Sequence, residues 1–263
     1  MKNTTLALIF TVLLPLFTGL ASAQHNNGHD DPATREWLKA AQKTVNESSR
    51  LVMLGRELLN GGKLGESLLR CDEAQRILDE AHISGGYGIA ELYAEIYLAR
   101  GNFTLVIEQA AKAKRKDASR LRMTEAIALA MSGKLREAKK IVLAAVGTIE
   151  GSSDLRKANS LWELPIDRGE DKDYIIATAY LIRGLSNEIP DELALPQNDY
   201  REAIKFAPRS PSVYLPYCMW LYLHEKPEEA KAVLAKAKAI AKDKRTQAWL
   251  ETMGKMLRSQ HGI

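Results

Sequence analysis

Apolar residues recur at helical spacing along most of the chain, and single glycines separate the apolar stretches. In the clearest stretch, Leu51, Leu54 and Leu58 share one face of a helix. Gly62 follows where that helix should end, because glycine is favoured just beyond a helix C-terminus. The apolar face then resumes in a second helix, so this stretch predicts a helical hairpin at residues 48 to 80.

The same hairpin pattern returns further along the chain, at a period of about 32 to 39 residues. Gly101 and Gly133 fall in the turns of the second and third copies. In the last copy Pro227 opens the second helix, where the missing N–H of proline leaves no hydrogen bond unmade. The three further hairpins are predicted at residues 87 to 116, 118 to 149 and 211 to 242.

The repeat pattern is interrupted between about residue 150 and residue 197, where glycines, serines and prolines collect. Helices are still predicted at residues 174 to 186 and 198 to 206, and the connection between them is long and bounded by prolines. We interpret this stretch as a degenerate fourth hairpin with an irregular insertion. The chain then has about five hairpins and hardly a strand candidate, so the predicted fold class is all-α.

Further helices are predicted at both ends of the repeat region. Asp31 and Pro32 form an N-cap and first-turn pair for a leading helix through Ala41. Apolar residues at helical spacing predict a last helix at residues 245 to 258, which would cap the final apolar face. The helical domain is therefore predicted to span residues 31 to 260.

The repeating unit resembles that of the tetratricopeptide repeat (TPR) family. That unit has a Leu-Gly-type pair, an aromatic residue, a turn glycine, two alanines and a closing proline. The resemblance covers about residues 48 to 242 and implies a right-handed superhelical solenoid of about five hairpins with a C-terminal capping helix. The closest match to the family's repeat ending is Tyr200, Ala203, Ile204 and Pro208. The small residues that should let paired helices approach closely are Gly55, Ala94, Ala126, Gly184 and Cys218.

The N-terminus predicts export. Lys2, an apolar run and then Ala21 and Ala23 are typical of a cleavable secretory signal at residues 1 to 23. The alternative is a short membrane anchor, but a proline and a glycine break the run, which is shorter than the roughly 20 residues that span a bilayer. We expect a polar, disordered tail at residues 24 to 30, no membrane insertion after cleavage, and a periplasmic or secreted location.

Charge and cysteine content narrow the possible partners. The formal net charge is +4, and acidic residues alternate with basic ones along the predicted helices, which argues against a nucleic-acid surface. The densest basic run, which begins at Lys112, falls at a predicted helix end. Cys71 and Cys218 lie in hairpins far apart in the array, so we expect two buried thiols and no disulfide.

No motif for catalysis, cofactor binding or a metal site stands out, so no catalytic residue, cofactor or metal is predicted. Glu91 and Glu95 are one helical turn apart and could share a proton, but a solvated helix face is the favoured interpretation. The acidic stretch around Asp167 and Asp173 lacks the ligand spacing of a calcium-binding loop. These observations favour a binding protein over an enzyme.

In the TPR family the first helix of each hairpin lines a concave groove, so the resemblance implies a partner-binding groove here. Apolar and acidic residues at the matching positions disfavour a clamp for an acidic C-terminal peptide. For Leu215, Met219 and Tyr222, the alternative is that the capping helix covers them. The groove residues are Val52, Arg56, Glu91, Glu95, Met123, Ile127, Leu215, Met219 and Tyr222.

The sequence therefore favours an exported adaptor or scaffold that binds a protein or peptide segment in this groove and supports assembly of an envelope or secreted complex. Two alternatives stay open at this point. One is a solenoid that assembles with copies of itself. The other is an enzyme whose active site lies in the irregular insertion at residues 150 to 197.

Overall fold

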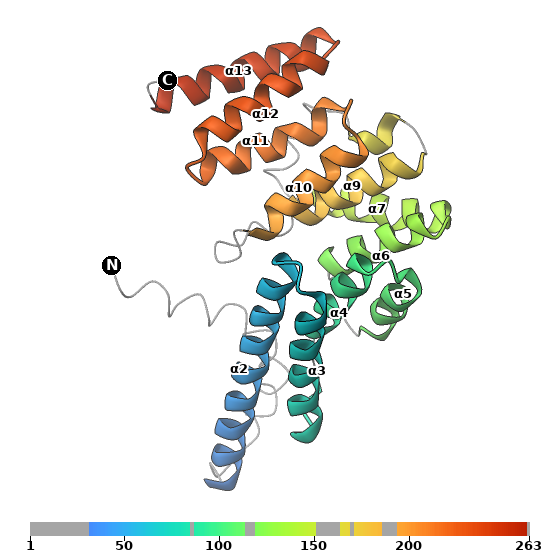
Figure 1. Cartoon of the computed structure of the whole chain (residues 1–263), viewed down its shortest axis with the longest axis vertical. Helices are drawn as coiled ribbons and strands as arrows, with labels where there is room; N and C mark the ends of the chain where they lie inside the picture. Colours follow the sequence, from blue (N-terminus) through green and yellow to red (C-terminus); the bar gives the residue numbers. More distant parts are fainter. Residues whose placement is uncertain are drawn as a thin grey trace, which may run out of the picture. The chain divides into compact units, whose positions relative to one another are not determined.

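The computed structural model describes residues 32–84, 87–113, 119–150, 164–168, 171–185 and 194–261. This part of the chain forms eleven α-helices and two short 3-10 helices, with no strand among the described residues, so the predicted all-α class is confirmed (Figure 1). The chain divides into two compact units, residues 1–45 and 46–263. The predicted signal and tail lie outside the described residues.

The first three predicted hairpins are present, each with a glycine in its turn. Gly62, Gly101 and Gly133 all have positive φ, where a side chain would be strained. The predicted leading helix does not end before the first hairpin, because no glycine or proline interrupts the sequence between Ala41 and Ser48. The pairs are α2 (Pro32–Asn60) with α3 (Leu64–Glu80), α4 (Tyr87–Ala99) with α5 (Phe103–Lys112), and α6 (Ser119–Met131) with α7 (Leu135–Glu150).

The remaining helices follow the irregular stretch. The helix predicted from residue 198 begins earlier, because Pro196 lies in its first turn, where its missing N–H costs nothing. Pro227 is the first residue of α12, as predicted. The elements are η1 (Pro165–Arg168), α9 (Lys172–Leu185), α10 (Ala194–Phe206), η2 (Pro211–Val213), α11 (Tyr214–Leu223), α12 (Pro227–Ile240) and α13 (Lys244–His261).

Four hairpin turns share one hydrogen-bonding pattern. In the α4–α5 turn, the N–H of Gly101 donates to Leu98 O at 3.0 Å and the N–H of Asn102 donates to Tyr97 O at 2.8 Å. These two bonds form the left-handed cap that commonly ends helices. The α2–α3 and α6–α7 turns repeat them. The α11–α12 turn does so too, with Glu225 at φ 58° in the position that glycine holds elsewhere.

From α3 onward, successive helices pack against each other, and α6 also packs against both α4 and α9. The contact between α6 and α9 includes a buried side-chain hydrogen bond. Arg183, in the last turn of α9, donates to the hydroxyl of Thr124 in the middle of α6 at 2.9 Å.

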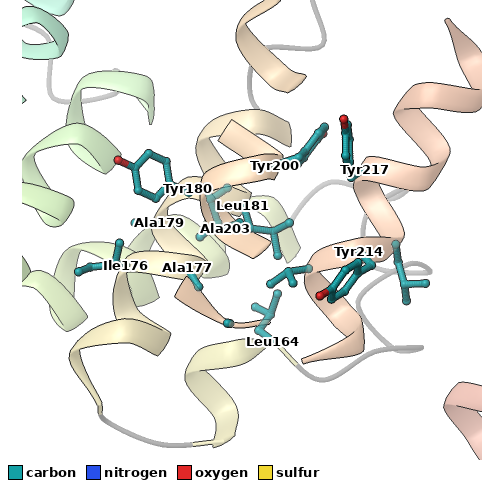
Figure 2. Packing of buried hydrophobic residues seen from close by; sticks show 14 of the residues in the cluster. Leu164, Ile176, Ala177, Ala179, Tyr180, Leu181, Tyr200, Ala203, Tyr214 and Tyr217 are labelled. Carbon is teal, nitrogen blue, oxygen red and sulfur yellow. The ribbon is translucent and has the colours of Figure 1, made fainter. Parts of the chain in front are cut away.

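The largest apolar core links residues of α6 through α13. Figure 2 shows part of it, where Tyr200 of α10 lies next to Tyr217 of α11 with ring centroids 6.0 Å apart. The five mid-helix small residues of the sequence analysis are all buried, as predicted. Both cysteines are buried and free, which confirms the expectation that they form no disulfide. No described helix is long and apolar enough to cross a membrane.

Candidate functional site

Most of the predicted groove residues are buried. The half-buried ones are Arg56, Met219 and Tyr222. The expectation that Glu91 and Glu95 form a solvated face is wrong, since they are 7% and 6% exposed. A buried side chain cannot contact a partner without a rearrangement, so the accessible part of the predicted surface is smaller than the sequence suggested. The buried groove residues are Val52, Glu91, Glu95, Met123, Ile127 and Leu215.

The two glutamates of α4 are buried because each meets an arginine. Glu91 accepts from Arg56 of α2 at 2.8 Å. Glu95 accepts a short hydrogen bond from the Nε of Arg120, at the start of α6. A buried carboxylate costs several kcal/mol unless a partner neutralises it, and these arginines do so. Glu91 and Glu95, which the sequence suggested as an acidic surface, therefore belong to a buried network of neutralised ion pairs.

A third carboxylate, that of Asp199, draws two arginines together in the same region. Asp199 of α10 accepts from Nη2 and Nε of Arg183 at 2.6 and 3.0 Å through its Oδ1. Its Oδ2 accepts from Nη1 of Arg120 at 3.3 Å. We refer to Glu95, Arg120, Thr124, Arg183 and Asp199 as the clasp. These residues join α4, α6, α9 and α10.

Glu95 and Arg183 of the clasp keep their charges near neutral pH. Burial alone would raise the pKa of Glu95, but Arg120 and Arg56 outweigh it and lower that pKa to about 2. Burial likewise disfavours the charged form of Arg183, and Asp199 outweighs it, so the pKa of Arg183 lies above its usual value. A carboxylate with a pKa of about 2 cannot serve as a proton donor or acceptor near neutral pH. The clasp is suited to holding helices together, not to acid–base chemistry.

Arg120, Arg183 and Asp199 were not predicted from the sequence as members of a site. One signal was available, because Arg183 lies in an otherwise uncharged run from residue 174 to residue 185. A charge in a helix that is apolar on all sides indicates a buried charge with a partner. The partner could not be read from the sequence, since Asp199 and Arg120 come from two other helices.

An accessible apolar surface remains on α11. Met219, Tyr222 and Leu223 are three and four residues apart, so they lie on one side of the helix. Met219 and Tyr222 are half-buried, and Leu223 is 63% exposed. We refer to these three residues as the α11 row. Lys226 follows it, with its Nζ 5.5 Å from the centre of the Trp220 ring. The predicted alternative was that the capping helix covers Leu215, Met219 and Tyr222; of these three, only Leu215 is buried, at 2% exposed.

The described residues contain no group of three side chains placed to hold a metal ion. In the acidic stretch near α9, Asp171 and Asp173 are exposed, while Glu170 lies outside the described residues. Comparison with protein-family models and with curated proteins finds no match to this chain.

Proposed function

We propose that the chain is an exported adaptor or scaffold that binds a segment of a partner protein on the α11 row. The observation that carries the proposal is the 63% exposure of Leu223 beside the half-buried Met219 and Tyr222. Met219 and Tyr222 of the row belong to the predicted groove and are its accessible apolar residues, and Leu223 extends them beyond it. Contiguous exposed apolar side chains are typical of interaction sites, whereas single ones are common on any surface.

The proposal includes a TPR-like solenoid as the scaffold that presents the row. Its support is the left-handed turn geometry that four hairpins share, together with the buried small residues in the middle of the first helices.

The side chains of the α11 row also favour a different kind of partner from the one that the sequence suggested. Glu91 and Glu95 are paired with arginines, so they do not attract basic residues of a partner. The remaining features are three apolar side chains and the ammonium group of Lys226. We propose that the partner segment is an amphipathic helix, whose residues at helical spacing match the row.

Site-specific photo-crosslinking tests this proposal. Benzoylphenylalanine at position 223 should give a discrete crosslinked product with one partner protein in cells that export the chain. Position 69 is the matched control, since Leu69 of α3 is 64% exposed but has no neighbouring apolar row. Met219→Glu should remove the product at position 223 while circular dichroism stays unchanged. Equal products from positions 223 and 69 would show nonspecific capture and refute the proposal.

The same experiment separates the alternatives. A product of twice the chain mass would favour the self-assembling solenoid. No product from position 223, together with loss of cellular function on deletion of residues 167 to 173, would favour an active site in the irregular insertion. Export is tested independently, because the secreted or periplasmic form should begin at Gln24, as N-terminal sequencing would show.

A further inference from the structure

The first and last helices of the described chain differ on their outward sides. The last helix, α13, buries Leu250 and Met253, and its Gly254 lies close to Leu234 of α12. A terminal helix of a stacked array needs a polar outer side, since no further helix covers it. The residues of α13 that the structure shows exposed are polar apart from one alanine: Lys244, Gln247, Ala248, Glu251, Thr252 and Lys255. The first helix, α2, does not have such a side.

Two sides of α2 are covered by neighbouring helices. From residue 46 onward, α2 belongs to the larger compact unit. Gly55 faces α3, because its carbonyl oxygen accepts from the hydroxyl of Ser67 at 2.7 Å. Arg56 faces α4, where it pairs with Glu91. Since successive residues of a helix are about 100° apart, the side that contacts neither helix lies roughly opposite Gly55.

That outward side carries four exposed residues, Arg50, Met53, Leu54 and Glu57, which we refer to as the α2 row. Met53 is 55% exposed and Leu54 is 39% exposed. An apolar pair on the outward side of a terminal helix is unusual for an array that ends in solvent. Arg50 and Glu57 form no ion pair in the described part of the chain. Their charges are therefore available to a partner.

The α2 row is complementary to itself. Arg50 lies three residues before Met53, and Glu57 lies three residues after Leu54. If two copies meet about a two-fold axis that passes between Met53 and Leu54, their α2 helices run antiparallel. Each Arg50 then meets Glu57 of the other copy, and the apolar pairs meet at the centre. Two-fold interfaces require such a match, because the same surface forms both sides.

We propose that the α2 row is the interface of a homodimer, in which two copies associate through antiparallel α2 helices. An unrelated partner would not require opposite charges at equal distances from the centre of the row, whereas a second copy does. The row is short compared with the interfaces of stable complexes, which bury about 1,200 to 2,000 Å². The dimer should therefore form reversibly, and charge should determine which surfaces pair.

Dimerisation would place two α11 rows in one particle. A partner with two binding segments would then bind more tightly than it binds a single chain, because the second contact forms within one complex. This consequence rests on the proposed function, whereas the dimer rests on the α2 row alone.

Sedimentation equilibrium of the mature chain at concentrations up to about 0.5 mM tests the proposal, since that range reveals dissociation constants in the micromolar range. Arg50→Glu should raise the dissociation constant about tenfold or more, because glutamates then oppose each other at both ends of the interface. Glu57→Arg should have the same effect with arginines. An equimolar mixture of the two variants should associate as the wild type does, because each variant opposes the charges of the other. The matched control is Arg209→Glu, which makes the same charge change at an exposed residue after α10.

Thermal melts at low concentration should be the same for these variants, because Arg50 and Glu57 form no ion pair within one described chain. A monomer throughout the concentration range would overturn the proposal. So would an unchanged dissociation constant in Arg50→Glu, or a mixture of the two variants that fails to associate. A photo-crosslinker at position 53 that captures another protein and no second copy would assign the row to that protein instead. Loss of partner capture at position 223 alone would refute the proposed function and leave the dimer intact.

Discussion

Gly184 illustrates how the absence of one side chain determines the packing of α9 on α10. A Cβ atom at this position would lie 2.7 Å from Cε1 of Tyr200, which is closer than real Cβ atoms approach other heavy atoms. Tyr200 is fully buried and its ring lies near that of Tyr217, so it has little room to move away. Glycine is therefore needed at position 184 because a side chain would collide with Tyr200, and not because the backbone there requires glycine.

Gly184→Ala should lower the free energy of unfolding by about 1 to 3 kcal/mol, because it overpacks a filled core. The measurement is urea denaturation followed by circular dichroism. Gly65→Ala is the matched control, since a Cβ there meets nothing within 4 Å, and alanine is preferred to glycine in helices by roughly 0.5 to 1 kcal/mol. Equal effects of the two substitutions would mean that helix propensity, and not contact with Tyr200, decides the result.

The ionisation of Glu95 predicts a dependence of stability on pH. The pKa of this carboxyl falls from 4.5 to about 2 in the folded chain, mainly because Arg120 and Arg56 outweigh the effect of burial. Ionised Glu95 therefore stabilises the folded state above pH 4.5, and this contribution is lost as the pH falls toward 2.

Glu95→Gln should lower Tm at neutral pH, and the difference from the wild type should shrink below pH 4.5, where the wild-type carboxyl loses its advantage. Thermal melts at a series of pH values provide the measurement. Glu57→Gln serves as a control at an exposed position of α2. A Tm difference for Glu95→Gln that stays constant down to pH 2 would contradict the proposed pairing with Arg120.

Predictions about single residues succeeded where the spacing within one helix was enough to indicate burial. Gly55 and Cys218 were predicted to be small, buried residues from their places in their own helices, and they are buried. Glu91 and Glu95 were misjudged because the spacing on α4 says nothing about Arg56 and Arg120. Partners from distant helices decide whether a charge is solvated or buried, and one sequence does not specify them.

At the scale of helices, local signals determined most boundaries. The turn glycines and Pro227 act within a few residues, so the hairpins after the first were predicted within a few positions of their observed ends. The first hairpin was predicted to start at residue 48, but its first helix begins at Pro32. The start of α10 was missed because Pro196 was interpreted as the boundary of a loop. A proline in a first turn and a proline before a helix give the same sequence signal.

Glu225 provides a test of the repeated turn. Its φ of 58° places a residue with a side chain in a conformation that suits glycine, at the position that Gly62, Gly101 and Gly133 hold in the other three turns. Glu225→Gly should therefore stabilise the chain by up to about 1 kcal/mol, because the left-handed conformation costs roughly 1 to 2 kcal/mol for residues other than glycine. Chemical denaturation is the measurement.

Gly133→Ala is the reciprocal substitution, at φ 82° and with nothing within 4 Å of the added Cβ. Gly133→Ala should destabilise the chain by about the same amount, because alanine is strained in the left-handed backbone conformation while its Cβ collides with nothing. If Glu225→Gly lowers stability instead, the glutamate side chain contributes at this turn, and the equivalence of the four turns is wrong.

At the scale of the whole chain, the sequence indicated an all-α fold but not which helices surround α9. Periodicity along a helix indicates which side is buried, and α9 is buried on all sides, so its sequence did not indicate its neighbours. The largest core spans α6 to α13. The first hairpins are attached to it through α4, α5 and the clasp. This unequal distribution of contacts predicts that different parts of the chain unfold at different denaturant concentrations.

The two buried thiols report on these parts separately, since Cys71 lies in α3 and Cys218 lies in α11 within the largest core. Burial raises the pKa of both thiols, so neither should react with an alkylating reagent in the folded chain. With increasing urea we expect Cys71 to react first, because hairpins at the end of an array have fewer neighbours. Pulsed alkylation and peptide mass spectrometry would locate each modified cysteine.

Glu95→Gln should widen the interval between the two transitions, because Glu95 contacts Arg120 and so ties α4 to α6. It should move the Cys71 transition to lower urea concentration and leave the Cys218 transition nearly unchanged. Coincident transitions in the wild type would show that the chain unfolds as one cooperative unit. A shift of both transitions by the same amount in Glu95→Gln would show that the clasp contributes to the stability of the whole chain and not to the attachment of its first hairpins.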